Sequence, residues 1–170
     1  MEFLATYKIE KKGLYQVTVN ANSTIQDTNP TLNSKTIAFY AEDAEPNRRN
    51  VSTKLNAPSV TTTGGKVQLN GGDWTFTGTL QFANNTATPT KYAAFEGQTL
   101  YANVTFEDGT VKTYTSTLTD NKGKATFTVA NADLVSGKYS IVIWYNGEKT
   151  DTEYYLPTVS SVKSNINLVT

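Results

Sequence analysis

The sequence predicts an all-β protein, an antiparallel β-sandwich with an additional N-terminal β segment, and three observations lead to this prediction. Apolar and polar residues alternate with a period of two in several segments, the pattern of a strand with one buried face. Asp108-Gly109 and Asn146-Gly147 interrupt these segments and supply the positive φ angles that a two-residue hairpin turn requires. No long helical stripe occurs, and we expect at most a single turn at 131–135.

The clearest predicted core strand spans residues 74–82. Its apolar positions alternate with threonines and one glutamine, and they are Trp74, Phe76, Gly78, Leu80 and Phe82. The same alternation recurs in three later segments, with Val104, Phe106 and Val111, then Ala125, Phe127 and Val129, and finally Tyr139, Ile141, Ile143 and Tyr145. Because short turns separate these segments, we expect an antiparallel meander between residues 102 and 154.

Pro58 and the glycine pair Gly64-Gly65 mark a boundary between an N-terminal β segment, 1–59, and a sandwich, 60–157. The first segment is too poor in apolar residues to bury a strong core alone, so we expect it to make assembly contacts. Residues 158–170 form a tail strand in which Ile166 and Leu168 alternate with polar residues. This strand either closes the sandwich or pairs with a neighbouring subunit by strand addition.

Charge and hydropathy narrow the range of partners. The chain has 170 residues with 15 basic and 15 acidic side chains, so its formal net charge is zero. Nucleic acids and anionic membranes demand a concentrated basic field, and we therefore expect neither as a partner. The residues after Met1 do not form a cationic stretch followed by an apolar run, and no segment is long enough to span a bilayer. We accordingly expect synthesis in the cytoplasm without a signal peptide.

The residue types needed for most catalysis are missing. Histidine and cysteine are absent, which excludes the usual general base, the Ser–His nucleophile pair, thiolate chemistry and disulfides. Zinc and iron–sulfur sites are excluded with them. Glu42, Asp43 and Glu45 could serve a glycosidase or bind calcium, but beside Arg48 and Arg49 a solvated acidic turn is favoured. We predict no catalytic residues, no cofactor and no metal site, and hence no enzymatic activity.

Large aromatic side chains have two interpretations. Trp74 and Trp144 are expected in the sandwich core, because aromatics supply much of such a core. In the alternative, Trp144 joins Tyr145, Tyr154 and Tyr155 in an exposed platform on which a sugar stacks. That alternative leaves weak glycan binding open.

Two further tyrosines flank the predicted hairpin at 108–109. We expect Tyr101 and Tyr114 to face each other across its two strands. Cross-strand aromatic pairs stabilise a sheet, so structural stacking is the predicted role of this pair.

One segment resembles a known family. The run TLTDNKGKATF at 117–127, followed by GKYSI at 137–141, resembles the bacterial immunoglobulin-like modules, which often carry Thr-Asp-x-x-Gly-x-Ala-x-Phe before a Gly-x-Tyr strand start. The resemblance covers residues 63–156, roughly half of the chain. It implies an immunoglobulin-like sandwich that acts as a spacer, an adhesive or a virion-decorating element without catalysis. No tandem copy is visible, so a long adhesin stalk is not supported.

Together these observations favour a non-enzymatic virion structural protein, a phage capsid-decoration or tail-associated component. Its expected partners are capsid or tail proteins and sister subunits, in a homo-oligomer or a larger assembly located in the virion. The alternative is a secreted, extracellular cell-surface adhesin or pilus-like subunit with the same fold. A carbohydrate-active enzyme or lectin built on the sandwich is a third class.

Overall fold

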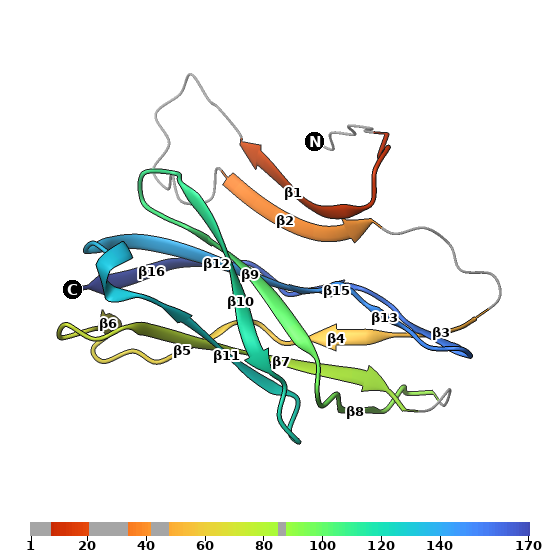
Figure 1. The fold of residues 1–170 in the computed structure, drawn as a ribbon. Coiled ribbons are helices and arrows are strands. Elements are labelled where there is room, and N and C mark those ends of the chain that lie inside the picture. Colours follow the sequence, from red (N-terminus) through yellow and green to blue (C-terminus); the bar gives the residue numbers. More distant parts are fainter. Residues whose placement is uncertain (1–7, 21–33, 42–47, 85–87) are drawn as a thin grey trace.

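The computed structural model describes residues 8–20, 34–41, 48–84 and 88–170, and this part of the chain is all-β. Two layers of strands form a β-sandwich, and a two-stranded hairpin lies beside one of the layers (Figure 1). Within the described ranges, helical structure is confined to the 3₁₀ turn η2, Asn131–Asp133, inside the predicted single turn. The predicted all-β sandwich is therefore confirmed.

The first layer is a six-stranded sheet. Its strands follow the order β10 (Val111–Leu118), β9 (Thr99–Thr105), β12 (Gly137–Tyr145), β16 (Lys163–Val169) and β6 (Val67–Gln68), while β15 (Thr158–Val159) also pairs with β12. All of these pairs are antiparallel except β16 with β6, which is parallel. The tail strand β16 thus lies between two strands of its own chain. Of the two predicted roles for the tail, it closes the sandwich.

The second layer is centred on β7, Trp74–Ala83. One edge of β7 pairs with β4 (Thr53–Leu55) and β5 (Ser59–Val60), and the other pairs with β11 (Lys124–Val129) and β8 (Tyr92–Ala94). Every pair in this layer is antiparallel. The strand that the sequence marks most clearly is therefore the central strand of its layer.

Two smaller sheets complete the described structure. At one end of the sandwich, β13 (Glu148–Lys149) pairs with β14 (Glu153–Tyr155), which pairs in parallel with β3 (Arg49–Val51). Separately, β1 (Gly13–Asn20) and β2 (Ser34–Ala41) form an antiparallel hairpin, with β2 close to β15. Since β3 and β4 precede residue 59 but pair with β14 and β7, the segment 1–59 contributes strands to the sandwich.

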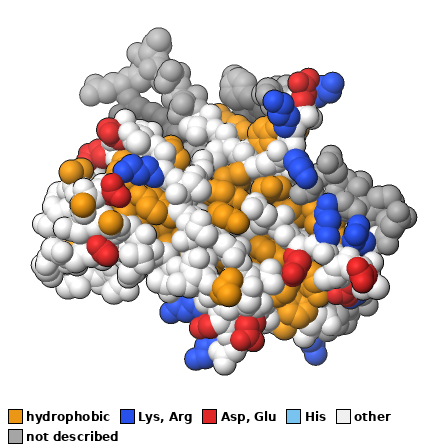
Figure 2. Space-filling view, in the orientation of Figure 1, with side chains coloured by type: hydrophobic (Ala, Val, Ile, Leu, Met, Phe, Trp, Pro, Cys, Tyr) orange, Lys and Arg blue, Asp and Glu red, His pale blue; other side chains and the backbone are white. Residues whose placement is uncertain are grey.

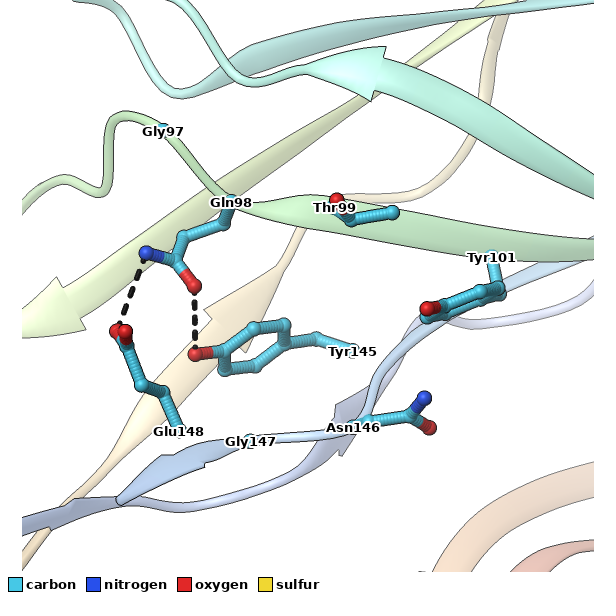
Figure 3. Close-up of a pocket in the computed structure, with 8 residues that line it drawn as sticks. All are labelled: Gly97, Gln98, Thr99, Tyr101, Tyr145, Asn146, Gly147 and Glu148. Atoms are coloured by element: carbon cyan, nitrogen blue, oxygen red, sulfur yellow. Dashed lines mark hydrogen bonds between the residues drawn. The ribbon is translucent and has the colours of Figure 1, made fainter. Parts of the chain in front are cut away.

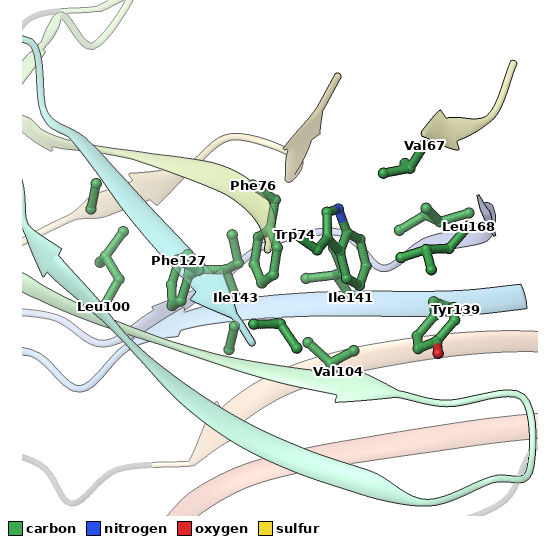
Figure 4. Packing of buried hydrophobic residues seen from close by; sticks show 14 of the residues in the cluster. Val67, Trp74, Phe76, Leu100, Val104, Phe127, Tyr139, Ile141, Ile143 and Leu168 are labelled. Atoms are coloured by element: carbon green, nitrogen blue, oxygen red, sulfur yellow. The ribbon is translucent and has the colours of Figure 1, made fainter. Parts of the chain in front are cut away.

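Between the layers lies one hydrophobic core (Figure 4). Phe76 and Phe127 stack with ring centroids 4.9 Å apart, a contact of the kind that adds about 0.5–1.5 kcal/mol to stability beyond the burial of apolar area.

Gly78 explains how closely the layers approach. A Cβ at this position would lie 3.0 Å from Ile143 Cδ1 and 3.2 Å from Leu100 Cδ1, so the missing side chain lets both residues reach the backbone of β7.

The predicted meander is wrong, although its first hairpin is confirmed. Asp108 and Gly109 do turn β9 into β10, with Gly109 at φ +85°. The next turn, at 120–123, instead carries the chain from β10 in one layer to β11 in the other, where β11 pairs with β7. Strand β12 then returns to pair with β9. A period of two identifies the buried face of each strand, but it does not identify the neighbouring strand.

Candidate functional site

The β1–β2 hairpin carries an exposed apolar face. Tyr15, Val17 and Val19 of β1 share one face with Ile37 and Phe39 of β2, because Val17 pairs with Ile37 and Tyr15 with Phe39. The rings of Tyr15 and Phe39 stack 5.6 Å apart. Val19 remains 64% exposed and Ile37 51% exposed. These five residues, named the hairpin face below, form an apolar surface of a kind that marks contact sites.

A second surface feature is the edge strand β10. In the described part of the chain, β10 pairs only with β9, so its outer edge presents unpaired backbone groups. Val111 and Leu118 are both exposed on this strand. A register shift between Thr115 and Leu118, where Ser116 Oγ accepts a hydrogen bond from the Leu100 amide, makes the edge irregular. Such irregularity limits uncontrolled strand addition.

A stacked aromatic pair lies on the outer face of the first layer. Tyr101 of β9 and Trp144 of β12 are paired in register, and their rings stack 5.7 Å apart at an interplanar angle of 26°. Trp144 Nε1 donates a hydrogen bond of 2.9 Å to Asn146 Oδ1. Ile143 and Tyr145, on either side of Trp144, are buried. The alternation of β12 therefore directs the indole of Trp144 outward.

This arrangement corrects the interpretation of the aromatic residues. Trp74 is buried in the core as predicted, but the prediction for Trp144 is wrong, because Trp144 is only partly buried on the outer face. The alternative platform does not form either, since Tyr145 and Tyr154 are buried. Tyr155 packs against phenylalanines in the second layer and its flanking loop.

The predicted pair of Tyr101 with Tyr114 is also wrong. Tyr101 pairs with Thr115, whereas Tyr114 pairs with Ala102. Positions that differ by one residue in register lie on opposite faces of a sheet, so the two tyrosines point away from each other. The actual partner of Tyr101 is Trp144, on the strand at its other side.

A pocket of about 260 Å³ opens beside the aromatic pair (Figure 3). Its lining residues come from the start of β9, the end of β12 and the turn into β13, and they are Gly97, Gln98, Thr99, Tyr101, Tyr145, Asn146, Gly147 and Glu148. Figure 3 places Gln98 and Glu148 at one end of the pocket and Tyr101 at the other.

Hydrogen bonds hold the polar side chains of this pocket in place. The Tyr145 hydroxyl donates to Gln98 Oε1 at 2.9 Å, and Gln98 Nε2 donates to Glu148 Oε2 at 3.2 Å. Burial, together with the nearby Glu148 carboxylate, raises the pKa of Tyr145 well above the usual value for tyrosine. The Tyr145 hydroxyl therefore stays protonated as a donor and fixes the orientation of the Gln98 amide.

The sequence held a signal for part of this site. The buried alternation Tyr139, Ile141, Ile143, Tyr145 places Trp144 on the opposite face of β12, where its side chain is only partly buried. Gln98 and Glu148 were not among the predicted site residues. They are brought together by the pairing of β9 with β12, which local sequence patterns do not reveal.

Some charged side chains in the described ranges form ion pairs that join neighbouring segments of the chain. Figure 2 shows acidic and basic side chains interspersed on the visible face. The Glu153 carboxylate accepts hydrogen bonds from the Tyr155 hydroxyl and from the Arg49 guanidinium, and the second bond joins β14 to β3. Both bonds lower the pKa of the Glu153 carboxyl group. Among the residues with a described placement, no three His, Cys, Asp or Glu side chains cluster as a metal site would require. The acidic residues Glu42 and Asp43, with Glu45, lie outside the described residues.

These surfaces offer an apolar contact area, an unpaired strand edge and a small polar pocket beside an aromatic pair.

Over the described ranges, no helix has the length and apolar character needed to cross a membrane. Comparisons with protein-family models, curated proteins and solved structures find no match to this chain.

Proposed function

We propose that this chain is a non-enzymatic virion structural protein, a capsid-decoration or tail-associated component that attaches through its hairpin face. The observation that carries the proposal is the exposure of Val17, Val19 and Ile37 on one side of a two-stranded ribbon. Removing apolar surface from water contributes roughly 25 cal/mol per Å², so a partner that covers these side chains gains affinity without a special motif. The sandwich supplies the stiff body from which the ribbon is presented.

The order of the strands supports an immunoglobulin-like topology for that body. One layer contains β5, β7 and β11, and the other runs β6, β16, β12, β9 and β10. In immunoglobulin-like sandwiches, strands A, B and E share a sheet that faces strands G, F and C, to which C′ is added in the variable type. The present order matches this scheme with β7 as B, β9 as C, β11 as E, β12 as F and β16 as G. The parallel pair of β6 with β16 adds a short strand beside G.

The tail is not part of the proposed contact. Strand β16 is hydrogen-bonded to β12 on one edge and to β6 on the other, and Leu168 is fully buried. At Leu168 both edges of β16 are paired within the chain, so this end of the strand is occupied within its own sandwich. The proposed contact with capsid or tail proteins is the hairpin face, whose Val17, Val19 and Ile37 are exposed.

Fractionation of the native source tests the proposal. We expect the chain to co-sediment with virus particles in a density gradient, where mass spectrometry of gradient fractions detects it. Recovery of the chain in the cell envelope, or only as a free monomer, would overturn the proposal. The first of these outcomes would favour the secreted adhesin instead.

A competition experiment tests the surface. Particles that carry the chain are incubated with an excess of purified labelled protein, and exchange onto the particle is measured after sedimentation. We expect exchange for the wild type and for Val135→Asp, a control at an equally exposed apolar position on the sandwich. The double variant Val19→Asp/Ile37→Asp should not exchange, because two carboxylates on the hairpin face oppose desolvation. Equal exchange by both variants would exclude the hairpin face.

A further inference from the structure

The aromatic pair and the pocket beside it point to a ligand that the assembly role does not explain. We propose that Tyr101, Trp144, Gln98, Asn146 and Glu148, named the shelf below, bind one neutral pyranose unit of a saccharide. The motivating observation is the meeting of a stacked, partly buried aromatic pair with a pocket lined by fixed polar side chains. This inference goes beyond the proposed structural function and stands on different residues.

The aromatic part of the shelf matches the apolar face of a pyranose ring. Such a ring presents C–H groups on its faces and hydroxyl groups at its edge, and aromatic rings are large, rigid apolar surfaces. Tyr101 lines the pocket and is held by its stack with Trp144, while Trp144 is held by its hydrogen bond to Asn146. Because these rings are already oriented, a sugar that stacks on them orders few side chains on binding.

The polar part of the shelf matches the hydroxyl edge. Glu148 accepts one hydrogen bond from Gln98 at 3.2 Å, and a carboxylate has further acceptor positions on its two oxygens. Asn146 uses its Oδ1 toward Trp144, which leaves its amide nitrogen as a donor. The Glu148 acceptor and the Asn146 donor both line the pocket and can bind hydroxyls at the edge of the sugar ring, since each hydroxyl both donates and accepts.

Charge and size define the class of ligand. Among the residues that line the pocket, Glu148 is the charged one, so an anionic sugar would meet a like charge. The volume of about 260 Å³ lies below the range of pockets that enclose drug-sized ligands, which suits a single monosaccharide unit. The shelf is therefore suited to one neutral unit at the end or side of a glycan.

The two tryptophans give a direct readout of binding. Trp74 is buried in the core, whereas Trp144 lies in the shelf, so the ¹H–¹⁵N spectrum should show two indole signals, one from each environment. Trp144→Phe removes one signal and thereby assigns the other. The probes are the methyl glycosides of glucose, galactose, mannose and N-acetylglucosamine, with methyl glucuronide as the anionic counterpart. We expect a saturable shift of the Trp144 signal below about 10 mM of at least one neutral glycoside and no shift of the Trp74 signal.

Three variants make the test specific. Tyr101→Ala and Glu148→Gln should each weaken binding roughly tenfold, since one removes the stacking surface and the other a charged acceptor. Glu148 is exposed, so its substitution leaves the fold intact even if Tyr101→Ala does not. Tyr92→Ala, an exposed tyrosine on β8 in the other layer, is the matched control and should bind as the wild type does.

Two results would overturn the inference. One is the absence of a saturable Trp144 shift with every neutral glycoside up to about 50 mM, a concentration at which even very weak sites are occupied. The other is equal binding of methyl glucuronide, which would contradict the role of Glu148. The hairpin-face variant Val19→Asp/Ile37→Asp should bind the glycoside normally, so this test is independent of the proposed function.

Discussion

The backbone of Gly123 lies directly against the backbone of Leu80. The Leu80 amide donates a hydrogen bond of 2.8 Å to the Gly123 carbonyl oxygen, and the Leu80 carbonyl in turn accepts one from Phe95 at 3.1 Å. The turn that carries the chain from one layer to the other is thus fixed to the central strand β7. Gly123 has φ +74°, and a Cβ here would lie 2.2 Å from the Leu80 carbonyl oxygen. The crossover between the layers therefore depends on a residue without a side chain.

Gly123→Ala should destabilise the protein strongly. The left-handed backbone alone costs a residue with a side chain about 1–3 kcal/mol, and the clash with the Leu80 carbonyl adds to this cost. Gly65→Ala is the control, because Gly65 has φ +75° with nothing within 4 Å of an added Cβ. Urea denaturation measures both variants. Equal losses of unfolding free energy would show that the contact with Leu80 contributes nothing.

Asp120 should make stability depend on pH at the same turn. Its Oδ1 accepts hydrogen bonds from the amides of Lys124 and Lys122, at 2.9 and 2.8 Å, and these bonds lower the pKa of the carboxyl group. Because the pKa is lower in the folded state than in the unfolded state, the carboxylate stabilises the fold above the unfolded pKa. This stabilisation is lost as the pH falls through the folded pKa.

Asp120→Asn tests this dependence, because it removes the charge and keeps the shape. We expect the variant to melt at a lower temperature than the wild type at pH 7, with the difference shrinking as the pH falls through the lowered pKa of the wild-type carboxyl group. Thermal melts across this pH range provide the measurement. A difference in melting temperature that stays constant with pH would contradict the assignment.

The two tryptophans should differ in their contribution to stability. Trp74 packs between Phe76 and Tyr139 at ring distances of 5.3 and 5.5 Å, and removing a buried aromatic side chain typically costs about 3–5 kcal/mol. Trp144 has one cross-strand partner on the outer face, so Trp144→Ala should cost only about 1 kcal/mol. Denaturant titrations of Trp74→Ala and Trp144→Ala compare the two. A larger loss for Trp144→Ala would place it in the core after all.

The sequence predicts the buried faces of strands well but not their neighbours. Trp74, Phe76 and Phe127 follow the period of two, and all three are buried. The same period cannot tell whether the next strand pairs with the last one or crosses to the other layer, because both routes bury the same residues. The predicted meander therefore pairs β10 with β11, whereas in the structure β11 pairs with β7.

The candidate shelf was only partly predictable for a related reason. Trp144 could be placed outside from the alternation in β12, and Tyr101 from the alternation in β9. That they touch depends on β9 pairing with β12, which lies more than 30 residues further along the chain. The contact of Gln98 with Glu148 depends on the same pairing and on the turn after Asn146. The register between distant strands is set by the packing of the whole sandwich, so local sequence patterns do not predict it.

The tail strand should contribute to global stability, since it is held on both edges. Leu168 is fully buried and Ile166 nearly so, and a buried leucine cut to alanine costs about 2–5 kcal/mol. We expect Leu168→Ala to lower the unfolding free energy by this amount, while Asn167→Ala, at the exposed position between them, changes it little. Hydrogen exchange should show the amides of Gly137 and Tyr139, opposite Leu168 and Ile166, as protected as those of β7. Rapid exchange across 163–169 together with a neutral Leu168→Ala would mean that β16 detaches from the sandwich and is free to pair with another chain.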